Sequence, residues 1–398
     1  MQICICRVRV EGNIVNYITQ IRGVSYKPSD LHDSLNKNSI ILLRANNIDE
    51  GKINFEDVVY VDKSKVSETQ ILRENDILIC ASSGSKNLVG KAASFNGNIE
   101  CTFGAFCKVI RPRNILGSYL SAFFQSKYYR FHISQFANGV NINNIKNEHI
   151  NSFSIPERTL EEQKEISYKV FSLNRVIENY NRELELLDEL VKARFVEMFG
   201  DENNSKGWEI VNIEDVANVQ VGVVIKPSQY YTDQDSGIKA FRSLNIGNGY
   251  IKDDDWVYFS EEGNKKNKKS ILSTNDVLIV RSGAPGTACV VTSEYAGSNA
   301  IDVIIAHPNF QKVDSHYLCT YTNMPHGKSQ IIEGTGGAAQ QHFNVGKYNK
   351  LKLMLPPLEY QKQYVKFLEE IDKSRSRIQK SLEASQELFD SLMQEYFG

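Results

Sequence analysis

The stretch LEEQKEISYKVFSLNRVIENYNRELELLDELVKARFVEMFG, residues 160–200, decides the fold because it predicts one long helix. Its large apolar residues recur alternately three and four positions apart, the spacing of the a and d positions of a coiled coil. A helix of this length extends over roughly 60 Å at about 1.5 Å per residue, and its narrow apolar seam needs a partner to be buried. The seam residues are Ile166, Val170, Leu173, Ile177, Tyr180, Leu184, Leu187 and Val191.

The same seam returns 198 residues later with two polar interruptions, Arg375 and Ser385. Because the two copies match in length and register, we predict that they pair as an antiparallel coiled coil. Two alternatives stay open, namely ordinary bundle helices inside the domains or seams that pair with another subunit. Arg375 and Ser385 are expected to set the register or to face a partner. The second seam consists of Tyr364, Leu368, Ile371, Arg375, Ile378, Leu382, Ser385 and Phe389.

The duplication extends through the rest of the chain. The segment from Gly23 to Ser29 resembles that from Gly222 to Ser228, and the motif that begins at Arg44 returns at Arg242. The helix ends repeat as well, with Phe199-Gly200 copied as Phe397-Gly398. We therefore expect a first globular domain over 1–155, a spacer helix over 156–200, a second domain over 201–355 and a second spacer helix over 356–398.

Within each globular half, short β-branched runs are separated by Gly, Asn, Asp and Ser, which is typical of strands and turns. The expected strands lie near 58–61, 77–80, 106–110, 277–280 and 301–305, and single helices are expected over 116–135 and 315–332. The predicted fold class is α+β: two tandem, strand-rich α/β domains, each followed by a long helix, with pseudo-two-fold symmetry.

Composition restricts the possible functions. The chain has 398 residues, of which 41% are hydrophobic and 24% charged, and no apolar run is long enough to cross a membrane, so we expect a cytoplasmic protein. Its seven scattered cysteines favour reduced positions in the core or at sheet edges. The net charge is −2, but residues 1–155 hold 18 Lys and Arg against 13 Asp and Glu. A nucleic acid would therefore need local basic patches or a basic partner.

The motifs of catalysis are incomplete in this sequence. The only Pro-Pro pair follows Leu355 rather than the Asn or Asp that an adenine methyltransferase needs. The segment from Gly84 to Lys91 has one residue too many for a P-loop and continues with Ala92. The run of aspartates over 253–255 lacks a spaced partner and favours a solvated loop over a metal site. We predict no catalytic residue, no metal ligand and no cofactor in this chain.

The second long helix is entered through LPPLEYQK, residues 355–362. A partly matching copy of this segment starts at Ile155-Pro156 and ends at Gln163-Lys164. With the internal repeat and the Phe-Gly helix ends, this signature resembles the specificity subunit of Type I restriction-modification systems over the whole chain. The first copy departs from the pattern at residues 157–159, where it has two extra residues and lacks the second proline.

The resemblance implies two target-recognition domains, each of which reads one half of a split, asymmetric DNA target. It implies that the helices act as a spacer and as a docking surface. The implied partners are double-stranded DNA, two modification subunits that bind S-adenosylmethionine and methylate adenine, and restriction subunits that use ATP. In this family the specificity subunit itself does no chemistry.

Base edges are read by amide, hydroxyl and basic side chains, whereas Lys and Arg on phosphates supply affinity. Three repeated places offer such residues: a Lys-Pro-Ser turn, the loop after the strand at 77–80 or 277–280, and an amide-rich loop before each long helix. Arg44 and Arg242 follow a strand and suit either a structural or a binding role. The candidates in these places are Lys27, Lys226, Ser83, Lys86, Arg281, Ser282, Asn141, Asn143, Gln340 and Gln341.

Each candidate also has a simpler interpretation as an ordinary surface turn with an incidental charge. Within the amide-rich loops, Asn144 and Asn344 match at an offset of 200 and are expected to be structural, as caps or turn residues. The run with Lys265, Lys266 and Lys268 is predicted to be a phosphate clamp rather than a solvated loop tip.

Two functions of other classes remain. One is a coiled-coil scaffold that binds only protein, and the other is a self-contained DNA-modifying enzyme with an unrecognised site. Salt-sensitive DNA binding separates the first from a DNA reader, and activity of the isolated chain would establish the second.

Overall fold

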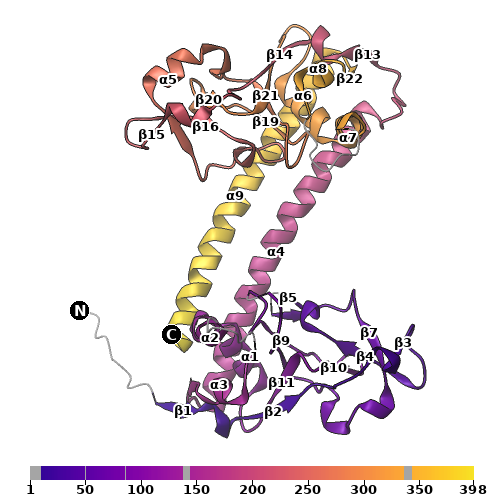
Figure 1. The fold of residues 1–398 in the computed structure, drawn as a ribbon, viewed down its shortest axis with the longest axis vertical. Coiled ribbons are helices and arrows are strands. Elements are labelled where there is room, and N and C mark those ends of the chain that lie inside the picture. The colour runs from indigo at the N-terminus through magenta and orange to yellow at the C-terminus, as the bar shows by residue number, and fades with distance from the viewer. Residues whose placement is uncertain (1–9, 50, 86, 138–143, 336–342) are drawn as a thin grey trace. The chain divides into compact units, whose positions relative to one another are not determined.

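The computed structural model describes residues 10–49, 51–85, 87–137, 144–335 and 343–398. The chain divides into two compact units (Figure 1). Unit 1 comprises Met1–Asn181 together with Lys380–Gly398, and unit 2 comprises Arg182–Gln379. Each unit therefore contains one globular domain and a part of both long helices.

Two four-stranded sheets form the domain of unit 1. The first is antiparallel, in the order β2 (Ile18–Arg22), β11 (Cys107–Pro112), β8 (Ile77–Cys80) and β9 (Ala92–Ser94). The second has the order β10 (Cys101–Phe103), β4 (Ser39–Leu43), β7 (Val59–Asp62) and β3 (Leu31–His32), with β10 and β4 parallel. Two small pairs complete it: β1 (Glu11–Asn13) with β12 (Ser154–Pro156), and β5 (Ile48–Asp49) with β6 (Lys52–Ile53).

Three short helices accompany these sheets, and Figure 1 shows them grouped beside the long helix α4 (Leu160–Phe199). Helix α1 packs on β9. Its residues Tyr119, Leu120 and Phe123 are fully buried, because they share one face of the helix at three- and four-residue spacing. The three helices are α1 (Gly117–Gln125), α2 (Lys127–Ala137) and α3 (Asn147–Asn151).

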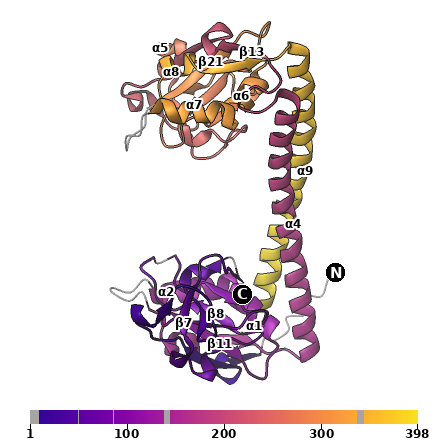
Figure 2. The same cartoon turned by 90° about the vertical axis from the view of Figure 1, so that its right-hand side faces the viewer.

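Unit 2 repeats both four-stranded sheets and the small pair beside the long helix, and an isolated bridge between Ile246 and Ile251 replaces the β5–β6 pair. Its sheets have the orders β14 (Ala217–Val221), β21 (Val303–Pro308), β18 (Val277–Val280), β19 (Ala288–Val290), and β15 (Tyr231–Thr232), β17 (Val257–Phe259), β16 (Ile238–Phe241), β20 (Asn299–Ala300). Strand β13 (Glu209–Asn212) pairs with β22 (Lys352–Leu355). Figure 2 shows α6 and α7 next to each other, and α6 packs on β19. The helices are α5 (Glu261–Lys266), α6 (Ser315–Asn323), α7 (Pro325–Thr335) and α8 (Val345–Asn349).

Repeated glycines mark a close backbone approach in each unit. Val24 and Val223 form isolated parallel bridges with Gly104 and Ile301. A Cβ on Gly23 would come within 2.1 Å of the Gly104 carbonyl oxygen, and one on Gly222 within 2.3 Å of the Ala300 oxygen. Because such contacts are sterically impossible, both positions require glycine.

The long helices α4 and α9 (Leu358–Phe397) have 40 residues each, as the repeat predicts. Their seam residues are buried or half-buried; Val170 and Tyr364, for example, are fully buried. Both helices begin in one unit and end in the other.

The helices pair antiparallel within each unit, which confirms the prediction. In unit 1 the core contains Val170 from the start of α4 and Phe397 from the end of α9. In unit 2 the core contains Tyr364 from the start of α9 and Phe199 from the end of α4. In each unit the beginning of one helix thus shares a core with the end of the other.

The repeated phenylalanines at the helix ends are core residues of the domains. The ring of Phe397 lies 5.3 Å from that of Tyr119 in unit 1, and the ring of Phe199 lies 4.8 Å from that of Tyr317 in unit 2. Both phenylalanines are at most 2% exposed. Burial of aromatic rings of this size contributes a large part of the stability of a small core.

The repeated glutamines tie the start of each long helix to its domain. Gln361 accepts a hydrogen bond from the Asp314 N–H (2.8 Å) and donates to the Pro356 carbonyl (2.8 Å). Gln163 accepts from the Leu116 N–H (2.8 Å) and donates to the Arg158 carbonyl (2.9 Å). The signature glutamine thus satisfies backbone groups that the chain exposes where a helix begins.

Arg375, the first polar interruption of the second seam, pairs with Asp188 of α4 at 2.6 Å in unit 2. This contact fits the expected role in register. The side-chain hydroxyl of Ser385 donates to the Ser381 carbonyl of its own helix at 2.8 Å.

Two local predictions were wrong. The single helices expected over 116–135 and 315–332 are each two helices, because Ser126 adopts extended backbone and Pro325 starts a new helix after Met324. The lysine run, whose clamp role stays a prediction, is partly helical, since Lys265 and Lys266 lie in α5.

The second concerns the amide-rich loops, whose described ends correspond at an offset of 198. Ile145 donates to the Ala81 carbonyl just as Phe343 donates to the Arg281 carbonyl, so Asn344 corresponds to Lys146 rather than to Asn144. Asn344 caps α8 by accepting from the Lys347 N–H, as expected, whereas Asn144 forms a bridge with Ser82.

We predict that Gln361→Ala lowers the free energy of unfolding of unit 2 by about 1–3 kcal/mol, because the buried Asp314 N–H loses its acceptor. Urea denaturation of the purified chain measures this effect. Gln363→Ala, at an exposed position of the same helix, is the matched control. Equal stability of the two variants would contradict the role of Gln361.

Candidate nucleic-acid interface

In unit 1 the structure brings the three predicted places together. The Ile145 N–H donates to the Ala81 carbonyl (2.7 Å), and Ser82 bridges Asn144, so the loop after β8 lies beside the residues that precede α3. The bridge between Val24 and Gly104 connects the segment that leads to Lys27 with the turn before β11. In that turn the Phe106 carbonyl accepts from the Ala81 and Ser82 N–H groups of the loop after β8. These contacts place the three loops on one edge of the domain.

The unit 1 candidates in the described residues differ in exposure. Lys27 is exposed, and its backbone N–H donates to the Asp30 carboxylate at 2.8 Å, which fixes the turn and leaves the amine in solvent. Ser83 is half-buried, and its hydroxyl accepts from the Ser85 N–H at 3.1 Å. Lys86, Asn141 and Asn143 lie outside the described residues.

In unit 2 one arginine connects the same places. Arg281 is 16% exposed at its side chain and pairs with Asp302 at 2.7 Å. Its Nε–H donates to the Phe343 carbonyl at 3.1 Å, and the Asp302 N–H donates to the Val223 carbonyl at 3.2 Å. Arg281 is therefore a structural link between loops, and a role in DNA contact stays a prediction. Gln340 and Gln341 lie outside the described residues.

Lys226 occupies the exposed tip of the loop after β14, in left-handed backbone with φ of +44°. A non-glycine residue rarely adopts this conformation. The two residues before it, Val224 and Ile225, are 50% and 78% exposed. This loop therefore presents a cation next to two apolar side chains.

A hollow in unit 2 lies between the loop that follows β16 and the loop that follows β18. One predicted place, the loop after β18, thus forms part of the wall of this concave surface through Ser282. The other lining residues are Ser243, Leu244, Ile246, Gly247, Asn248, Tyr250, Lys252, Val280, Gly283, Ala284 and Thr287.

Arg44 and Arg242 each support a turn. Their side chains pair with Asp57 at 3.0 Å and with Asp255 at 3.3 Å. The backbone N–H of each arginine also donates to the side-chain oxygen of the asparagine three residues later, Asn47 or Asn245. A DNA contact by either arginine stays a prediction.

The lysine run is partly neutralised by its own helix. Lys265 pairs with Glu261 at 3.5 Å and Lys266 with Glu262 at 2.7 Å, both at i,i+4 spacing. Lys268 is exposed in the short 3₁₀ turn that follows. Since the two glutamates weaken its field, the predicted phosphate clamp would depend chiefly on Lys268 and its neighbour Lys269.

Sequence reasoning missed two residues of unit 1. Phe106 is 70% exposed at the turn between β10 and β11, and Lys108 is only 7% exposed in β11. The lysine was recognisable as a charge inside the apolar run Cys107 to Ile110. The phenylalanine was not, because it reads as part of the same strand.

Lys108 holds the end of the amide-rich loop in place. Its amine donates to Asn147 Oδ1 (2.7 Å), Gln20 Oε1 (3.1 Å) and the Ile145 carbonyl (3.3 Å). All three acceptors are neutral, and burial lowers the pKa of Lys108 to about 8. A buried amine without a carboxylate partner is costly, which indicates a positioning role.

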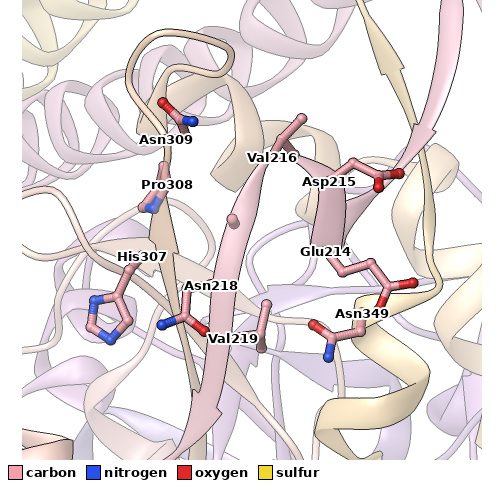
Figure 3. A pocket seen from close by; sticks show the side chains of 10 residues that line it. Glu214, Asp215, Val216, Asn218, Val219, His307, Pro308, Asn309 and Asn349 are labelled. Carbon is pink, nitrogen blue, oxygen red and sulfur yellow. The ribbon is translucent and has the colours of Figure 1, made fainter.

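Unit 2 has no counterpart of this buried lysine among its described residues, and a separate hollow lies beside β14. By strand register, Ile304 and Val219 replace Lys108 and Gln20. Figure 3 shows the Asn349 amide beside the Glu214 carboxylate, with His307 on the other side of β14. The Asn349 Oδ1 atom is buried and has no hydrogen-bond partner among the described residues. Carboxylates at this hollow make it unsuited to phosphate.

The described residues contain no metal-binding cluster, and their cysteines are buried. Among the described residues, no group of three His, Cys, Asp or Glu lies close enough to hold a metal ion. The five cysteines in those residues are free and buried, as expected, and burial raises the pKa of Cys80 to about 11. No helix in the described part of the chain is long and apolar enough to span a membrane.

Known sequences match this chain along most of its length. The Type I restriction modification DNA specificity domain matches twice, at residues 24–188 and at residues 205–386. The chain belongs to this family. Its function is therefore DNA specificity in a Type I restriction-modification system, and two tandem recognition domains fit a target in two parts.

Two specificity subunits are similar over almost the whole chain. The StySPI subunit of Salmonella potsdam is 28% identical over 399 residues, which cover 94% of this chain and 84% of that protein. The EcoKI subunit of Escherichia coli K12 is 28% identical over 392 residues, which cover 92% and 82%.

Solved structures share the fold of this specificity chain. The S subunit from M. genitalium aligns with a TM-score of 0.61 at 13% identity, and the alignment covers 100% of this chain and 98% of that one. A chain from a study of assembly and conformational transition of the type I R-M system aligns with a TM-score of 0.55 at 15% identity, covering 96% and 97%.

The low pKa of Lys108 predicts a pH-dependent stability of unit 1. Between about pH 8 and 10.5 the unfolded chain keeps the Lys108 proton that the folded chain releases, so this residue makes the free energy of unfolding rise with pH. In urea unfolding at several pH values, Lys108→Met should remove this rise. The exposed control Lys27→Met should keep it. Parallel pH profiles for the wild type and Lys108→Met would contradict the assignment.

Proposed function

We propose that the domain of unit 1 reads one half of an asymmetric, bipartite DNA target and that the domain of unit 2 reads the other half. The observation that carries this proposal is one scaffold with different side chains at equivalent positions beneath and along the edge that bears the candidate loops. Ala81, Phe106 and Lys108 of unit 1 correspond by register to Arg281, Asp302 and Ile304 of unit 2. Two domains with different side chains at the same edge recognise different sequences.

Affinity is expected to depend on the assembled complex. Several candidate cations of this chain are already paired with carboxylates, including Arg44, Arg242 and Arg281. Exposed lysines such as Lys27, Lys226 and Lys268 remain for phosphates. Because phosphate contacts supply most of the affinity for DNA, basic partner subunits would complete the electrostatic surface.

The long helices space the two domains and dock the partner subunits. In unit 1, α4 exposes Tyr168 (75%) and Phe171 (37%) in a groove with Lys164 and Arg175, which fits contact with another protein. The expected partners are two modification subunits and the restriction subunits. Adenine methylation with S-adenosylmethionine and the use of ATP belong to those subunits, and this chain supplies specificity only.

Co-expression with a modification subunit, followed by single-molecule sequencing of a plasmid, tests the proposal. We expect adenine methylation at one split, asymmetric motif. The isolated chain is the control and should methylate nothing. A stable complex that neither methylates nor retains DNA in a salt-sensitive way would contradict the proposal and favour a scaffold that binds only protein.

Inserting seven residues after both Asn181 and Gln379 tests the role of the helices as a spacer. A heptad keeps the seam in register and adds roughly 10 Å to each helix, so the gap of the motif should lengthen by roughly three base pairs. A methylated motif with an unchanged gap would contradict this role.

A further inference from the structure

Phe106 is held rigidly and yet exposes its ring. It lies in the tight turn between β10 and β11, which the hydrogen bond from the Cys107 N–H to the Gly104 carbonyl (2.8 Å) closes. The Phe106 carbonyl accepts from both the Ala81 and the Ser82 N–H, each at 2.9 Å. The ring is 70% exposed. The backbone is thus fixed by three hydrogen bonds, whereas the side chain projects into solvent.

This turn lies where the candidate loops of unit 1 meet. Ala81 and Ser82 begin the loop after β8, and Ser82 also bridges Asn144. Gly104, at the start of the turn, pairs with Val24 in the segment before Lys27. The exposed ring is therefore carried by a turn whose backbone joins the loop after β8 and the segment before Lys27, and these segments bear hydroxyl and lysine side chains of the kinds that contact base edges and phosphates.

In unit 2 an exposed apolar side chain lies on a different loop, the loop after β14. By strand register Asp302 occupies the position of Phe106. Asp302 is acidic and pairs with Arg281, so unit 2 has no apolar side chain at this position. The Asp302 N–H donates to the Val223 carbonyl, and the next residues, Val224 and Ile225, are 50% and 78% exposed. Ile225 directly precedes Lys226, whereas the turn of Phe106 is joined through the Gly104–Val24 bridge to the segment that leads to Lys27.

Single exposed apolar residues are common on protein surfaces and need no function. Phe131 on α2, which is 62% exposed, is such a residue. Phe106 and Ile225 differ because each lies at the meeting of the candidate loops in its own unit, although the two loops that carry them are not equivalent. An exposed apolar residue thus occurs beside the candidate loops in both domains, and this second occurrence supports the inference from the first.

The apolar group that double-stranded DNA offers to a side chain in the major groove is the 5-methyl group of thymine. We propose that Phe106 and Ile225 are specificity-determining residues, each of which contacts a thymine methyl group in the half-site read by its unit. This inference rests on the proposed function. It adds a defined contact, between each of these side chains and a thymine methyl group in one half-site.

Deoxyuridine tests the contact because it lacks only the methyl group of thymine. The complex with its modification subunits is assembled with wild-type chain, Phe106→Ala, Ile225→Ala or the control Phe131→Ala. Each thymine of the methylated motif is replaced in turn by deoxyuridine, and binding is measured by competition at fixed salt. We expect one replacement in each half-site to weaken wild-type binding roughly three- to fivefold.

The variants decide the assignment. Phe106→Ala should abolish the deoxyuridine penalty in one half-site and keep it in the other, Ile225→Ala should do the reverse, and Phe131→Ala should keep both. Phe106→Leu, which retains an apolar group, should keep part of the penalty. These patterns together support the proposal.

Three outcomes would overturn it. The first is a half-site without thymine, and the second is a deoxyuridine penalty that persists in Phe106→Ala. The third is a loss of affinity in Phe106→Ala that is equal for DNA with thymine and DNA with deoxyuridine, which would indicate that the ring inserts between bases. Failure of the proposed function is distinguishable, because no split methylation motif would then exist to be substituted.

Discussion

The seating of each helix end in a domain core is the interaction on which the rest of this structure depends. Phe397, the next-to-last residue, packs with Tyr119 and Phe123 in the first domain, and Phe199 packs with Tyr317 and Tyr364 in the second. The first domain is therefore completed by the end of α9, which lies far from it in sequence, whereas unit 2 is one continuous stretch, Arg182–Gln379, that uses the end of α4 just before its domain. In each unit the domain core includes residues of both long helices, so the core and the helix pair stabilise each other.

This coupling explains how the chain separates architecture from specificity. The buried glutamines, the helix-end phenylalanines and the close glycine contacts repeat in both units, and they fix the edge on which the loops stand. The loops on that edge differ: a buried lysine supports one of them in unit 1, whereas an arginine ion pair links them in unit 2. Side chains on the loops can change without disturbing the core, which suits a protein whose function is to recognise a particular sequence.

The sequence predicted the large elements because their signals are long and repeated. Two 40-residue helices with matching seams, two equivalent domains and the family all followed from the heptad spacing and the repeated glutamine and Phe-Gly motifs. The break at Ser126 was not predictable from periodicity, since α1 and α2 continue the same apolar pattern. The offset of the amide-rich loops was misjudged because a match of two asparagines outweighed the backbone hydrogen bonds that define equivalence. The roles of Arg44, Arg242 and Arg281 depend on aspartates distant in sequence, and the exposure of Phe106 depends on a turn that strand propensity does not reveal.

Hydrogen exchange of Phe397→Ala, followed by mass spectrometry, tests most directly whether each domain depends on the long-helix end that is seated in its core. Removal of a buried phenylalanine costs about 3–5 kcal/mol, so peptides of the first domain should exchange faster although the substitution lies at the other end of the chain. Peptides of the second domain should keep their protection, and Phe199→Ala should give the opposite pattern. Unchanged protection of the first domain in Phe397→Ala, or an equal loss in both domains, would contradict the account.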